Sequence, residues 1–292
     1  MFPERMKFVQ RKFSSLLSQD NEVIFFNPET PSHCSSLSLD KLVAYQTFFP
    51  VVDQLERAGI KCVQSISQQK FNLAIISIPN SKKLARHLIY LATKAVPEGL
   101  IFVDGDKSNG IESIISDLKK HTKIKDVVSK AHGRIAWFET PADLETYKDV
   151  PLQIEDGFET RAGVFSSYGV DPASKLLAQL LPRDLTGVGA DLGAGWGYLS
   201  VKALETNSIS ELHLIEADLT AINLAKNNLN DQRVKFYWCD ALRWKAPKLL
   251  DFIIMNPPFH RLGRAIPKLG TDFIKVASRN LKKSGTLWMV AN

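Results

Sequence analysis

The sequence predicts an α/β fold with two doubly wound parallel sheets in tandem. Short apolar stretches with strand character alternate with helical stretches along the whole chain. The length of 292 residues suits about two domains. A glycine-rich turn also follows a short strand in the second half, as it does where a parallel sheet binds a ligand. We expect a first domain over residues 1–150 and a second over 151–292, with a hinge between Thr140 and Phe158.

The second half shows the alternation most clearly. Its expected strands are short and apolar: 189–192, 211–216, 234–239, 250–255 and 286–290. Its expected helices are amphipathic: 173–181, 199–205, 219–229 and a basic one around 273–281. Strands separated by helices of this length pair in parallel, which predicts a doubly wound sheet.

The first half has a similar rhythm, with expected strands at 22–26, 72–77, 100–103 and 135–138 and expected helices at 51–58, 84–95 and 111–120. Its strand at 72–77, followed by Ile78-Pro79-Asn80, parallels 251–255 followed by Asn256-Pro257-Pro258. Because 99–103 likewise parallels 285–290, we expect a duplicated domain. The first copy has no glycine-rich loop, so we expect it to serve substrate binding or stability. The second copy lacks its last helix and strand pair, which predicts a C-terminally truncated chain.

Composition excludes several classes of protein. The chain has no run of ~18 apolar residues for a membrane span and no signal-peptide core. Its three cysteines (Cys34, Cys62 and Cys239) are isolated, which argues against a disulfide framework or a cysteine zinc site. We therefore expect a cytoplasmic protein without a metal. The net charge of +6 and the pI of about 9.1 fit an RNA-facing surface, as they fit many other proteins.

A glycine-rich segment, Asp191-Leu192-Gly193-Ala194-Gly195-Trp196-Gly197, follows the strand at 189–192. It reads G-x-G-x-G and not the dinucleotide pattern G-x-G-x-x-G. Gly193, Gly195 and Gly197 let the backbone turn sharply and approach a ligand closely. This version suits a ligand with an amino-acid group, whose ammonium Asp191 could hold directly or through water.

Two further acids end the next two strands. Glu216 could accept hydrogen bonds from both ribose hydroxyls, while Asp240 suits an adenine amine and Ala241 offers a backbone N–H. Each acid also has a simpler interpretation: a helix N-cap for Asp191, a solvated strand end for Glu216 and a turn residue for Asp240. Three acids at the ends of three successive strands, beside a glycine loop, favour a nucleoside ligand site.

The tetrapeptide Asn256-Pro257-Pro258-Phe259 closes the strand at 250–255. The amino group of guanine or adenine is a poor nucleophile because its lone pair is delocalised into the ring. The side-chain carbonyl of Asn256 and the backbone carbonyl of Pro257 can each accept one of its N–H groups, which orients the lone pair and stabilises the charge that develops on nitrogen. Consecutive prolines remove N–H donors, so the loop presents carbonyls. Phe259 offers a face for stacking an unpaired or flipped base. The alternative is a proline-rich strand exit with a core Phe259.

Three other features are less specific. Phe165, in the segment Gly163–Asp171, could belong to a flap over the ligand or to a linker packed on the domain. His260 fits a structural or surface histidine better than a substrate contact. The stretch from Arg261 to Lys283 holds seven basic residues against Asp272 alone. It suits phosphate contacts or a solvated helix face.

At these residues the chain resembles class I methyltransferases, and within them the RsmC-like guanine-N2 ribosomal RNA methyltransferases with a "methyltransferase small" domain. The resemblance covers about residues 160–292. It rests on Gly163-Val164-Phe165-Ser166 with Asp171 and Ser174, on 191–197, on 256–260 and on 287–292. It implies a Rossmann-like fold, S-adenosylmethionine as the cofactor, and transfer of a methyl group to a guanine amine of small-subunit ribosomal RNA.

The residues that match the motifs are those named above. Asn256, Pro257 and Phe259 would take part in catalysis, and Asp191, Gly193, Gly195, Gly197, Glu216, Asp240, Ala241 and Phe165 would bind the cofactor. The expected partner is ribosomal RNA or the small ribosomal subunit, and we expect a monomer. Two alternatives stay open: methylation of a protein glutamine amide, and a truncated, inactive RNA-binding or assembly protein that keeps the fold.

Overall fold

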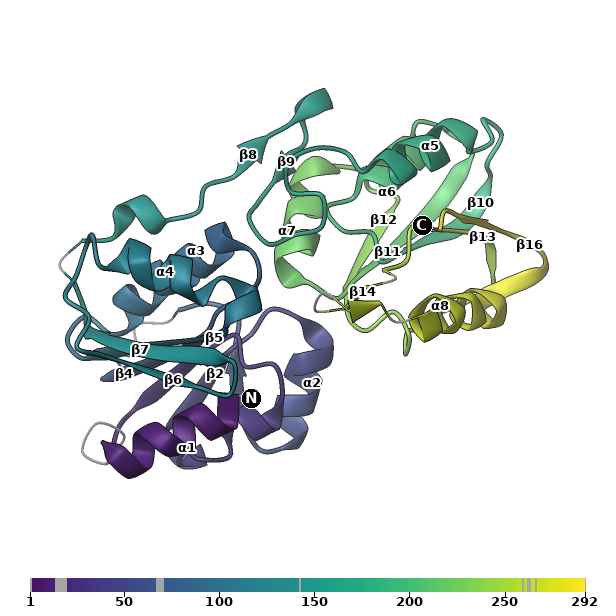
Figure 1. Cartoon of the computed structure of the whole chain (residues 1–292). Coiled ribbons are helices and arrows are strands. Elements are labelled where there is room, and N and C mark those ends of the chain that lie inside the picture. Colours follow the sequence, from purple (N-terminus) through teal and green to yellow (C-terminus); the bar gives the residue numbers. More distant parts are fainter. Residues whose placement is uncertain are drawn as a thin grey trace. The chain divides into compact units, whose positions relative to one another are not determined.

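The structure is a computed structural model that describes residues 2–13, 20–66, 71–141, 143–258, 260–261, 264–265 and 267–291. The chain divides into two compact units. Unit 1 comprises Met1–Thr47 with Val51–Val150, and unit 2 comprises Phe48–Pro50 with Pro151–Asn292. Each unit has its own sheet with helices packed on it (Figure 1). No helix in the described ranges is long and apolar enough to cross a membrane.

Unit 1 contains a seven-stranded sheet in the order β3-β2-β1-β4-β5-β7-β6. Its strands are β1 (Val23–Phe26), β2 (Leu42–Tyr45), β3 (Lys61–Val63), β4 (Leu73–Ser77), β5 (Leu100–Asp106), β6 (Asp126–Lys130) and β7 (Gly133–Glu139). The first five pair in parallel, whereas β7 runs antiparallel to β5 and β6. The expected doubly wound sheet is confirmed. The sequence did not predict β2, β3 or β6.

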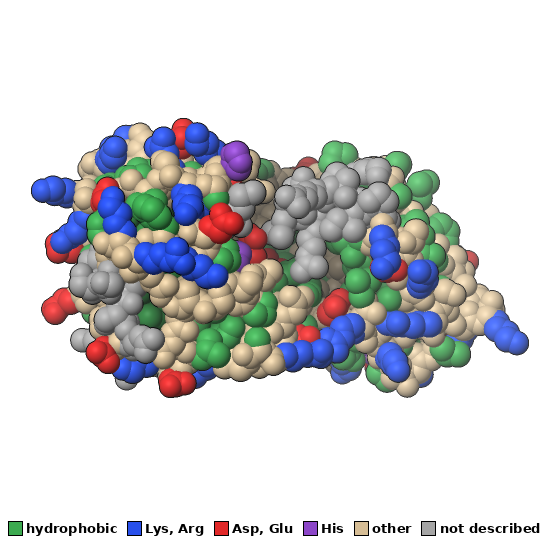
Figure 2. Space-filling view, turned by 60° about the horizontal axis from the view of Figure 1, so that its bottom comes forward, with side chains coloured by type: hydrophobic (Ala, Val, Ile, Leu, Met, Phe, Trp, Pro, Cys, Tyr) green, Lys and Arg blue, Asp and Glu red, His purple; other side chains and the backbone are tan. Residues whose placement is uncertain are grey.

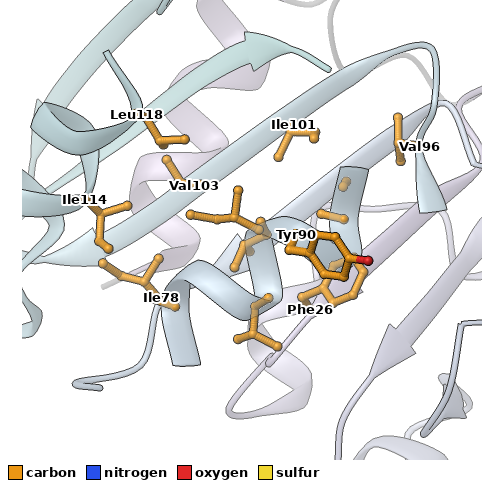
Figure 3. Packing of buried hydrophobic residues seen from close by; sticks show 14 of the residues in the cluster. Phe26, Ile78, Tyr90, Val96, Ile101, Val103, Ile114 and Leu118 are labelled. Atoms are coloured by element: carbon orange, nitrogen blue, oxygen red, sulfur yellow. The ribbon is translucent and has the colours of Figure 1, made fainter. Parts of the chain in front are cut away.

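The helices of the first half are α1 (Phe2–Lys12), α2 (Phe49–Arg57), α3 (Lys82–Ala95) and α4 (Ile111–Leu118). The sequence predicted the last three and missed α1. Helices α3 and α4 lie on one face of the sheet and α1 on the other (Figure 1). Figure 3 shows Ile101 and Val103 of β5 beside Tyr90 of α3 and Ile114 of α4, in one buried cluster. Because both faces of the sheet are covered, its central strands read as continuous apolar runs.

A buried ion pair connects α1 to this sheet. The Arg5 guanidinium donates from Nε to Asp104 Oδ1 at 2.6 Å and from Nη2 to Asp104 Oδ2 at 2.7 Å. The two side chains are 2% and 1% exposed. Nη1 also donates to the carbonyl of Ala131 at 3.1 Å. A Cβ on Gly133 would lie 2.3 Å from Nη1, so this position leaves no room for a side chain.

Unit 2 contains a five-stranded sheet in the order β12-β11-β10-β13-β16. Its strands are β10 (Gly187–Leu192), β11 (Ile209–Glu216), β12 (Val234–Trp238), β13 (Leu250–Met255) and β16 (Leu281–Met289). All of these pairs are parallel. The expected strand at 250–255 has the bounds of β13, whereas β16 begins five residues before the expected start at 286. The remaining strands form two short antiparallel pairs: β8 (Leu152–Gln153) with β9 (Glu159–Thr160), and β14 (His260–Arg261) with β15 (Arg264–Ala265).

The helices of unit 2 cover both faces of its sheet. They are α5 (Pro172–Leu180), α6 (Tyr198–Leu204), α7 (Leu219–Asn228) and α8 (Pro267–Asn280). The first three share a buried cluster on one face, and α8 packs on the other (Figure 1). At the centre of the sheet, a Cβ on Gly189 of β10 would lie 2.1 Å from the ring of Phe252 on β13. The glycine therefore makes room for the aromatic ring.

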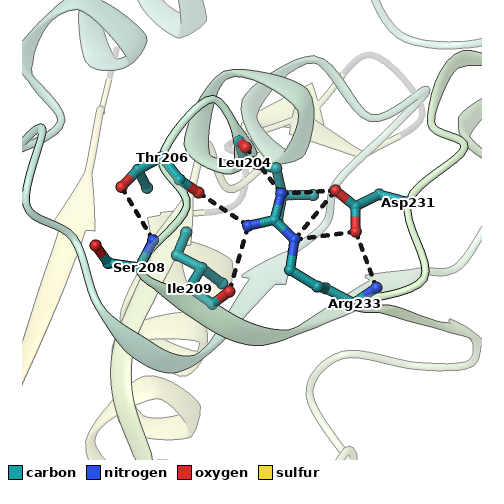
Figure 4. A network of polar contacts seen from close by, with 6 residues as sticks. All are labelled: Leu204, Thr206, Ser208, Ile209, Asp231 and Arg233. Carbon is teal, nitrogen blue, oxygen red and sulfur yellow. Dashed lines mark hydrogen bonds and ion pairs between the residues drawn. The ribbon is translucent and has the colours of Figure 1, made fainter.

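Arg233 forms hydrogen bonds at the end of this sheet that lies opposite the glycine loop. Its guanidinium donates to the carbonyls of Leu204, Thr206 and Ile209 at 2.9, 2.9 and 3.3 Å (Figure 4). It also pairs with Asp231, with Nη2 2.6 Å from Oδ2. Carbonyls at the end of α6 have no partner within the helix, and the arginine supplies one. It thus fixes the connection between α6 and β11.

Candidate active site

The segments predicted to bind a ligand follow the carboxyl ends of neighbouring parallel strands in unit 2. Strand β10 lies between β11 and β13, and Asp191 is the register partner of both Leu214 and Ile254. Because these strands are parallel, the glycine loop after β10 and Asn256 after β13 begin at neighbouring strand ends. This is the crevice at which doubly wound sheets bind ligands.

The glycine loop has the backbone that its composition predicts. Gly193, Gly195 and Gly197 have φ angles of 74°, 57° and 94°, in the left-handed region that side chains disfavour. A Cβ on Gly195 would meet no atom within 4 Å, so the loop borders open space there. A Cβ on Gly197 would lie 3.2 Å from that of Ala225 on α7. One glycine therefore faces room for a ligand, and another permits close packing of the following helix.

Asp191 is fully buried at 0% exposure. Its Oδ2 accepts a hydrogen bond from the Ser200 hydroxyl at 2.8 Å, and its Oδ1 has no hydrogen-bond partner among the described residues. A buried carboxylate oxygen without a donor is costly. An ammonium group or a water molecule would satisfy it, so Asp191 fits the amino-acid end of S-adenosylmethionine. The N-cap interpretation is wrong, because Gly197 is the N-cap residue of the following helix α6.

Burial raises the pKa of Asp191 from its ordinary value of 3.8 to about 7, despite the opposing hydrogen bond from Ser200. Folded protein therefore retains a proton that unfolded protein has already released above pH 4. This group's contribution to stability is complete below about pH 4 and is lost as the pH rises to 7. At 1.36 kcal/mol per pKa unit the loss approaches about 4 kcal/mol.

We therefore expect unit 2 without cofactor to become less stable between about pH 4 and pH 7, and Asp191→Asn to remove most of this slope. Urea unfolding at several pH values, followed by tryptophan fluorescence, measures it. The matched control is Asp184→Asn, since Asp184 is exposed. Equal slopes for the wild type and Asp191→Asn would contradict the assignment.

Glu216 links the end of β11 to the glycine loop. Its Oε2 accepts from the Gly195 N–H at 2.8 Å, and its Oε1 accepts from the N–H groups of Ala217 and Asp218 at 2.7 and 2.8 Å. Burial raises its pKa above the ordinary value, against the effect of these three donors. Unlike the solvated strand end of the simpler interpretation, the partly buried carboxylate is bound by three backbone N–H groups. It lies between two segments that the sequence predicts around one ligand, and hydroxyl groups of a ribose could compete for its oxygens.

Asp240 shapes the turn after β12. Its Oδ1 accepts from the Leu242 N–H at 2.9 Å, as expected of a turn residue. Ala241 is buried at 5% exposure. The contact of Asp240 and Ala241 with adenine stays a prediction.

Arg279 of α8 supports the same turn. Its Nη2 donates to the carbonyls of Leu242 and Trp244 at 2.7 and 3.1 Å. These bonds give Arg279 a structural role, while the phosphate-contact interpretation of the basic stretch stays a prediction. Lys282 pairs with Asp251 at 2.7 Å, whereas Lys268 and Lys283 are exposed. Figure 2 shows basic side chains spread over the face in view, with acidic ones between them.

The segment before α5 is tied to the glycine loop. Trp196 is 4% exposed, and its Nε1 donates to the carbonyl of Phe165 at 3.0 Å. Asn228 of α7 donates to the carbonyls of Trp196 and Glu159 at 2.9 and 3.0 Å. The Phe165 side chain itself is 62% exposed, so it does not pack on the domain as a linker residue would. Its contact with the cofactor stays a prediction.

Asn256 follows β13 and is partly buried. Its Nδ2 donates to Asp171 Oδ2 at 2.9 Å and to the Ser174 hydroxyl at 2.8 Å. The adjacent Pro257 is buried, and its carbonyl accepts no hydrogen bond within the described part of the chain. Phe259 lies outside the described residues, and only the backbone of His260 is described, in β14.

Sequence reasoning missed the supporting side chains of this site, namely Ser200, Asn228 and Arg279. No local pattern marks them, because their partners lie 9 to 37 positions away in the chain. Asp171 did carry a local signal, since Asp before Pro172 is typical of a helix N-cap. That signal predicts the cap of α5 but not the contact with Asn256.

Comparisons with known proteins agree with this geometry. Residues 155–292 match the family model of the methyltransferase small domain. The chain is 30% identical over 262 residues to a ribosomal RNA small subunit methyltransferase C of Shewanella loihica, covering 84% of this chain and 75% of the relative. It is 26% identical over 258 residues to a ribosomal RNA large subunit methyltransferase G of Yersinia pestis, covering 82% and 65%.

Among solved structures, the 16S rRNA N2-guanine methyltransferase RsmC of T. thermophilus, in complex with AdoMet and guanosine, superimposes with a TM-score of 0.78 at 22% identity. The match covers 95% of this chain and 82% of that one, and it establishes a shared fold. The fold, the glycine loop with its orphaned carboxylate oxygen and the 30% identity to a curated relative lead to one conclusion. The chain belongs to the RsmC-like family of S-adenosylmethionine-dependent methyltransferases.

Proposed function

We propose that this protein transfers a methyl group to the exocyclic N2 amine of a guanine in small-subunit ribosomal RNA. The observation that carries the proposal is the orientation of Asn256. Its NH₂ group is already bound by Asp171 and Ser174, so its carbonyl oxygen remains as the acceptor at the strand edge beside the glycine loop. An acceptor is what an amino substrate requires.

In the proposed reaction, the Asn256 carbonyl and the Pro257 backbone carbonyl each accept one N–H of the guanine amine. The nitrogen lone pair is thereby directed at the methyl carbon. S-adenosylmethionine would supply that carbon on a sulfonium, whose S–C bond breaks as the N–C bond forms, so that S-adenosylhomocysteine leaves as a neutral thioether. As the N–C bond forms, the carbonyls stabilise the positive charge on nitrogen, and the extra proton leaves to solvent afterwards. No strong base is required.

The proposed cofactor residues lie at the carboxyl ends of the same parallel strands. We propose that Asp191 holds the ammonium through its unpartnered Oδ1, that Glu216 binds the ribose hydroxyls, and that Asp240 with the Ala241 N–H binds adenine. Gly193, Gly195 and Gly197 provide the turn, and Phe165 covers the bound cofactor. Support comes from the buried Asp191 oxygen and from the open space at Gly195.

Unit 1, corresponding to residues 1–150, is proposed as a copy that does not hold the cofactor. Strand β1 lies between β2 and β4 as β10 lies between β11 and β13. No glycine-rich loop follows β1, and Ile78-Pro79-Asn80 follows β4 where Asn256-Pro257-Pro258 follows β13. This copy thus has neither the glycine loop nor the catalytic amide at the corresponding strand ends.

The substrate is tested by offering acceptors to the purified protein with methyl-labelled S-adenosylmethionine. The acceptors are small and large ribosomal subunits lacking methylation, their naked RNAs, and a release factor as the glutamine-bearing protein. Nuclease digestion and mass spectrometry identify the product. We expect N2-methylguanosine in small-subunit RNA. Label in large-subunit RNA would reassign the ribosomal target, and label in the release factor would support the glutamine alternative.

A cofactor-binding measurement distinguishes the proposed enzyme from an inactive RNA-binding or assembly protein. Calorimetry is expected to show binding of S-adenosylmethionine by the 292-residue chain. RNA binding without any cofactor binding would favour an assembly protein instead. The proposal places the protein in the cytoplasm, where ribosomal subunits are found, acting as a monomer.

A further inference from the structure

The side chain of Asn256 is held by the first turn of α5. Asp171 is the N-cap of this helix, and its Oδ2 accepts from the Ser174 N–H at 2.8 Å. The same oxygen accepts from Asn256 Nδ2 at 2.9 Å, although the two residues are 85 positions apart. Ser174 is 8% exposed and provides the second contact at 2.8 Å. Two side chains of one helix start thus bind one end of the amide.

These two partners differ in what they can specify. A hydroxyl can donate or accept, so Ser174 could bind either end of the Asn256 amide. A carboxylate oxygen only accepts, so Asp171 requires the NH₂ end. If the amide were reversed, its carbonyl oxygen would face the carboxylate and its NH₂ group would face the N–H of the incoming amine. Both changes are unfavourable.

We propose that Asp171 is a positioning residue that orients the Asn256 amide, so that its carbonyl oxygen is presented to the target amine. This inference rests on the proposed function of Asn256 as an acceptor. Asp171 acts through Asn256 and does not touch the substrate. The bond to a charged group also polarises the amide, which makes its carbonyl a stronger acceptor.

The test reverses the polarity of the pair. In Asn256→Asp, two carboxylates face each other where an amide met a carboxylate, and like charges at this distance disfavour the arrangement. In the double variant Asp171→Ser with Asn256→Asp, the introduced serine hydroxyl can accept from the Ser174 N–H and donate to the introduced carboxylate. The other oxygen of that carboxylate is then free to accept from the substrate amine. Serine is as good an N-cap as aspartate, so the helix keeps its cap.

We expect Asn256→Asp to lower kcat by about 100-fold and Asp171→Ser alone to lower it about threefold, because a hydroxyl leaves both amide orientations populated. The double variant is expected to recover at least about tenfold over Asn256→Asp, a coupling that marks direct interaction. The dissociation constant for S-adenosylmethionine is expected to stay within about twofold throughout. The matched control is Asn230→Asp at an exposed loop residue, which is expected to leave kcat unchanged whether or not Asp171→Ser is present.

If Asp171 only caps α5, then Asp171→Ser will not improve the Asn256→Asp variant, and that result overturns the proposal. Thermal unfolding gives a second reading that needs no substrate: Asn256→Asp lowers Tm, and Asp171→Ser restores it. Recovery of Tm without methylation of any acceptor by the wild type would leave the pairing intact and refute the proposed function. Absence of recovery in both kcat and Tm would refute the positioning role itself.

Discussion

Replacing Asn256 by alanine is expected to lower kcat for methyl transfer by about 100- to 1000-fold, the range seen when one preorganised polar group is removed from a reacting centre. The dissociation constant for S-adenosylmethionine is expected to change less than about twofold, because the proposed cofactor contacts come from β10, β11 and β12. The physical reason is that Asn256 acts on the amine as charge develops on nitrogen, and one carbonyl of Pro257 remains. Single-turnover kinetics with small-subunit RNA, together with calorimetry, measures both quantities.

The control for this variant is Asn230→Ala, which removes an asparagine side chain from an exposed loop position. It is expected to keep the wild-type kcat. Undiminished methylation of ribosomal RNA by Asn256→Ala would remove the asparagine from the mechanism. A parallel loss of cofactor affinity would instead indicate that the change also disturbs the proposed cofactor site at the carboxyl ends of the neighbouring strands.

The largest expected effect on stability lies in unit 1, at Arg5. Replacing Arg5 by methionine is expected to destabilise this unit by about 3–5 kcal/mol, since it leaves the carboxylate of Asp104 buried without its partner. That carboxylate is 1% exposed and accepts two hydrogen bonds from the guanidinium. Urea unfolding followed by circular dichroism measures the loss, which we expect in the transition of unit 1 alone.

Two comparisons identify the cause. The double variant Arg5→Met with Asp104→Leu removes both buried charges and leaves Asp106, which also pairs with Arg5 at 2.9 Å but is 42% exposed. It is expected to recover most of the loss, because apolar replacements of a buried ion pair are often neutral or stabilising. Arg57→Met removes an arginine that is 62% exposed and pairs with Asp53 at 3.0 Å. It is expected to cost less than about 0.5 kcal/mol. A cost below about 1 kcal/mol for Arg5→Met would contradict the assigned role of the pair.

The strands that sequence analysis predicted well are those with continuous apolar side chains. Strand β13 has the expected bounds, and β4 and β11 differ from expectation by at most two residues at one end. Of the missed strands, β3 and β6 lack this signal, whereas β2 (Leu42–Tyr45) has it and was missed nonetheless. β3 has only three residues, which are exposed or partly buried, and β6 has just one buried residue. Such strands form because a neighbouring strand presents hydrogen-bonding groups, and that neighbour is not visible locally in the sequence.

The candidate site likewise has features that local sequence predicts and features that depend on distant parts of the chain. Glycines with positive φ, a proline-rich loop and acids after strands are local requirements, so Gly193, Pro257 and Glu216 were recognisable as sequence. The burial and the hydrogen-bond partners of each side chain were not recognisable from the sequence. Asp191 is completely buried and hydrogen-bonded to Ser200, and Arg279, one of the seven basic residues from Arg261 to Lys283, supports the turn after β12.

The sequence by itself determined the succession of strands and helices, the glycine turn and the acceptor-rich loop, because each depends on residues close together in the chain. Only the tertiary structure decided which way the Asn256 amide faces and which carboxylate oxygen of Asp191 lacks a donor. These properties depend on hydrogen bonds between segments that come together through packing, as Asp171 and Asn256 do across 85 positions. Hydrogen bonds of this kind are directional, so the partner, and not the residue type, sets what each group can offer a substrate.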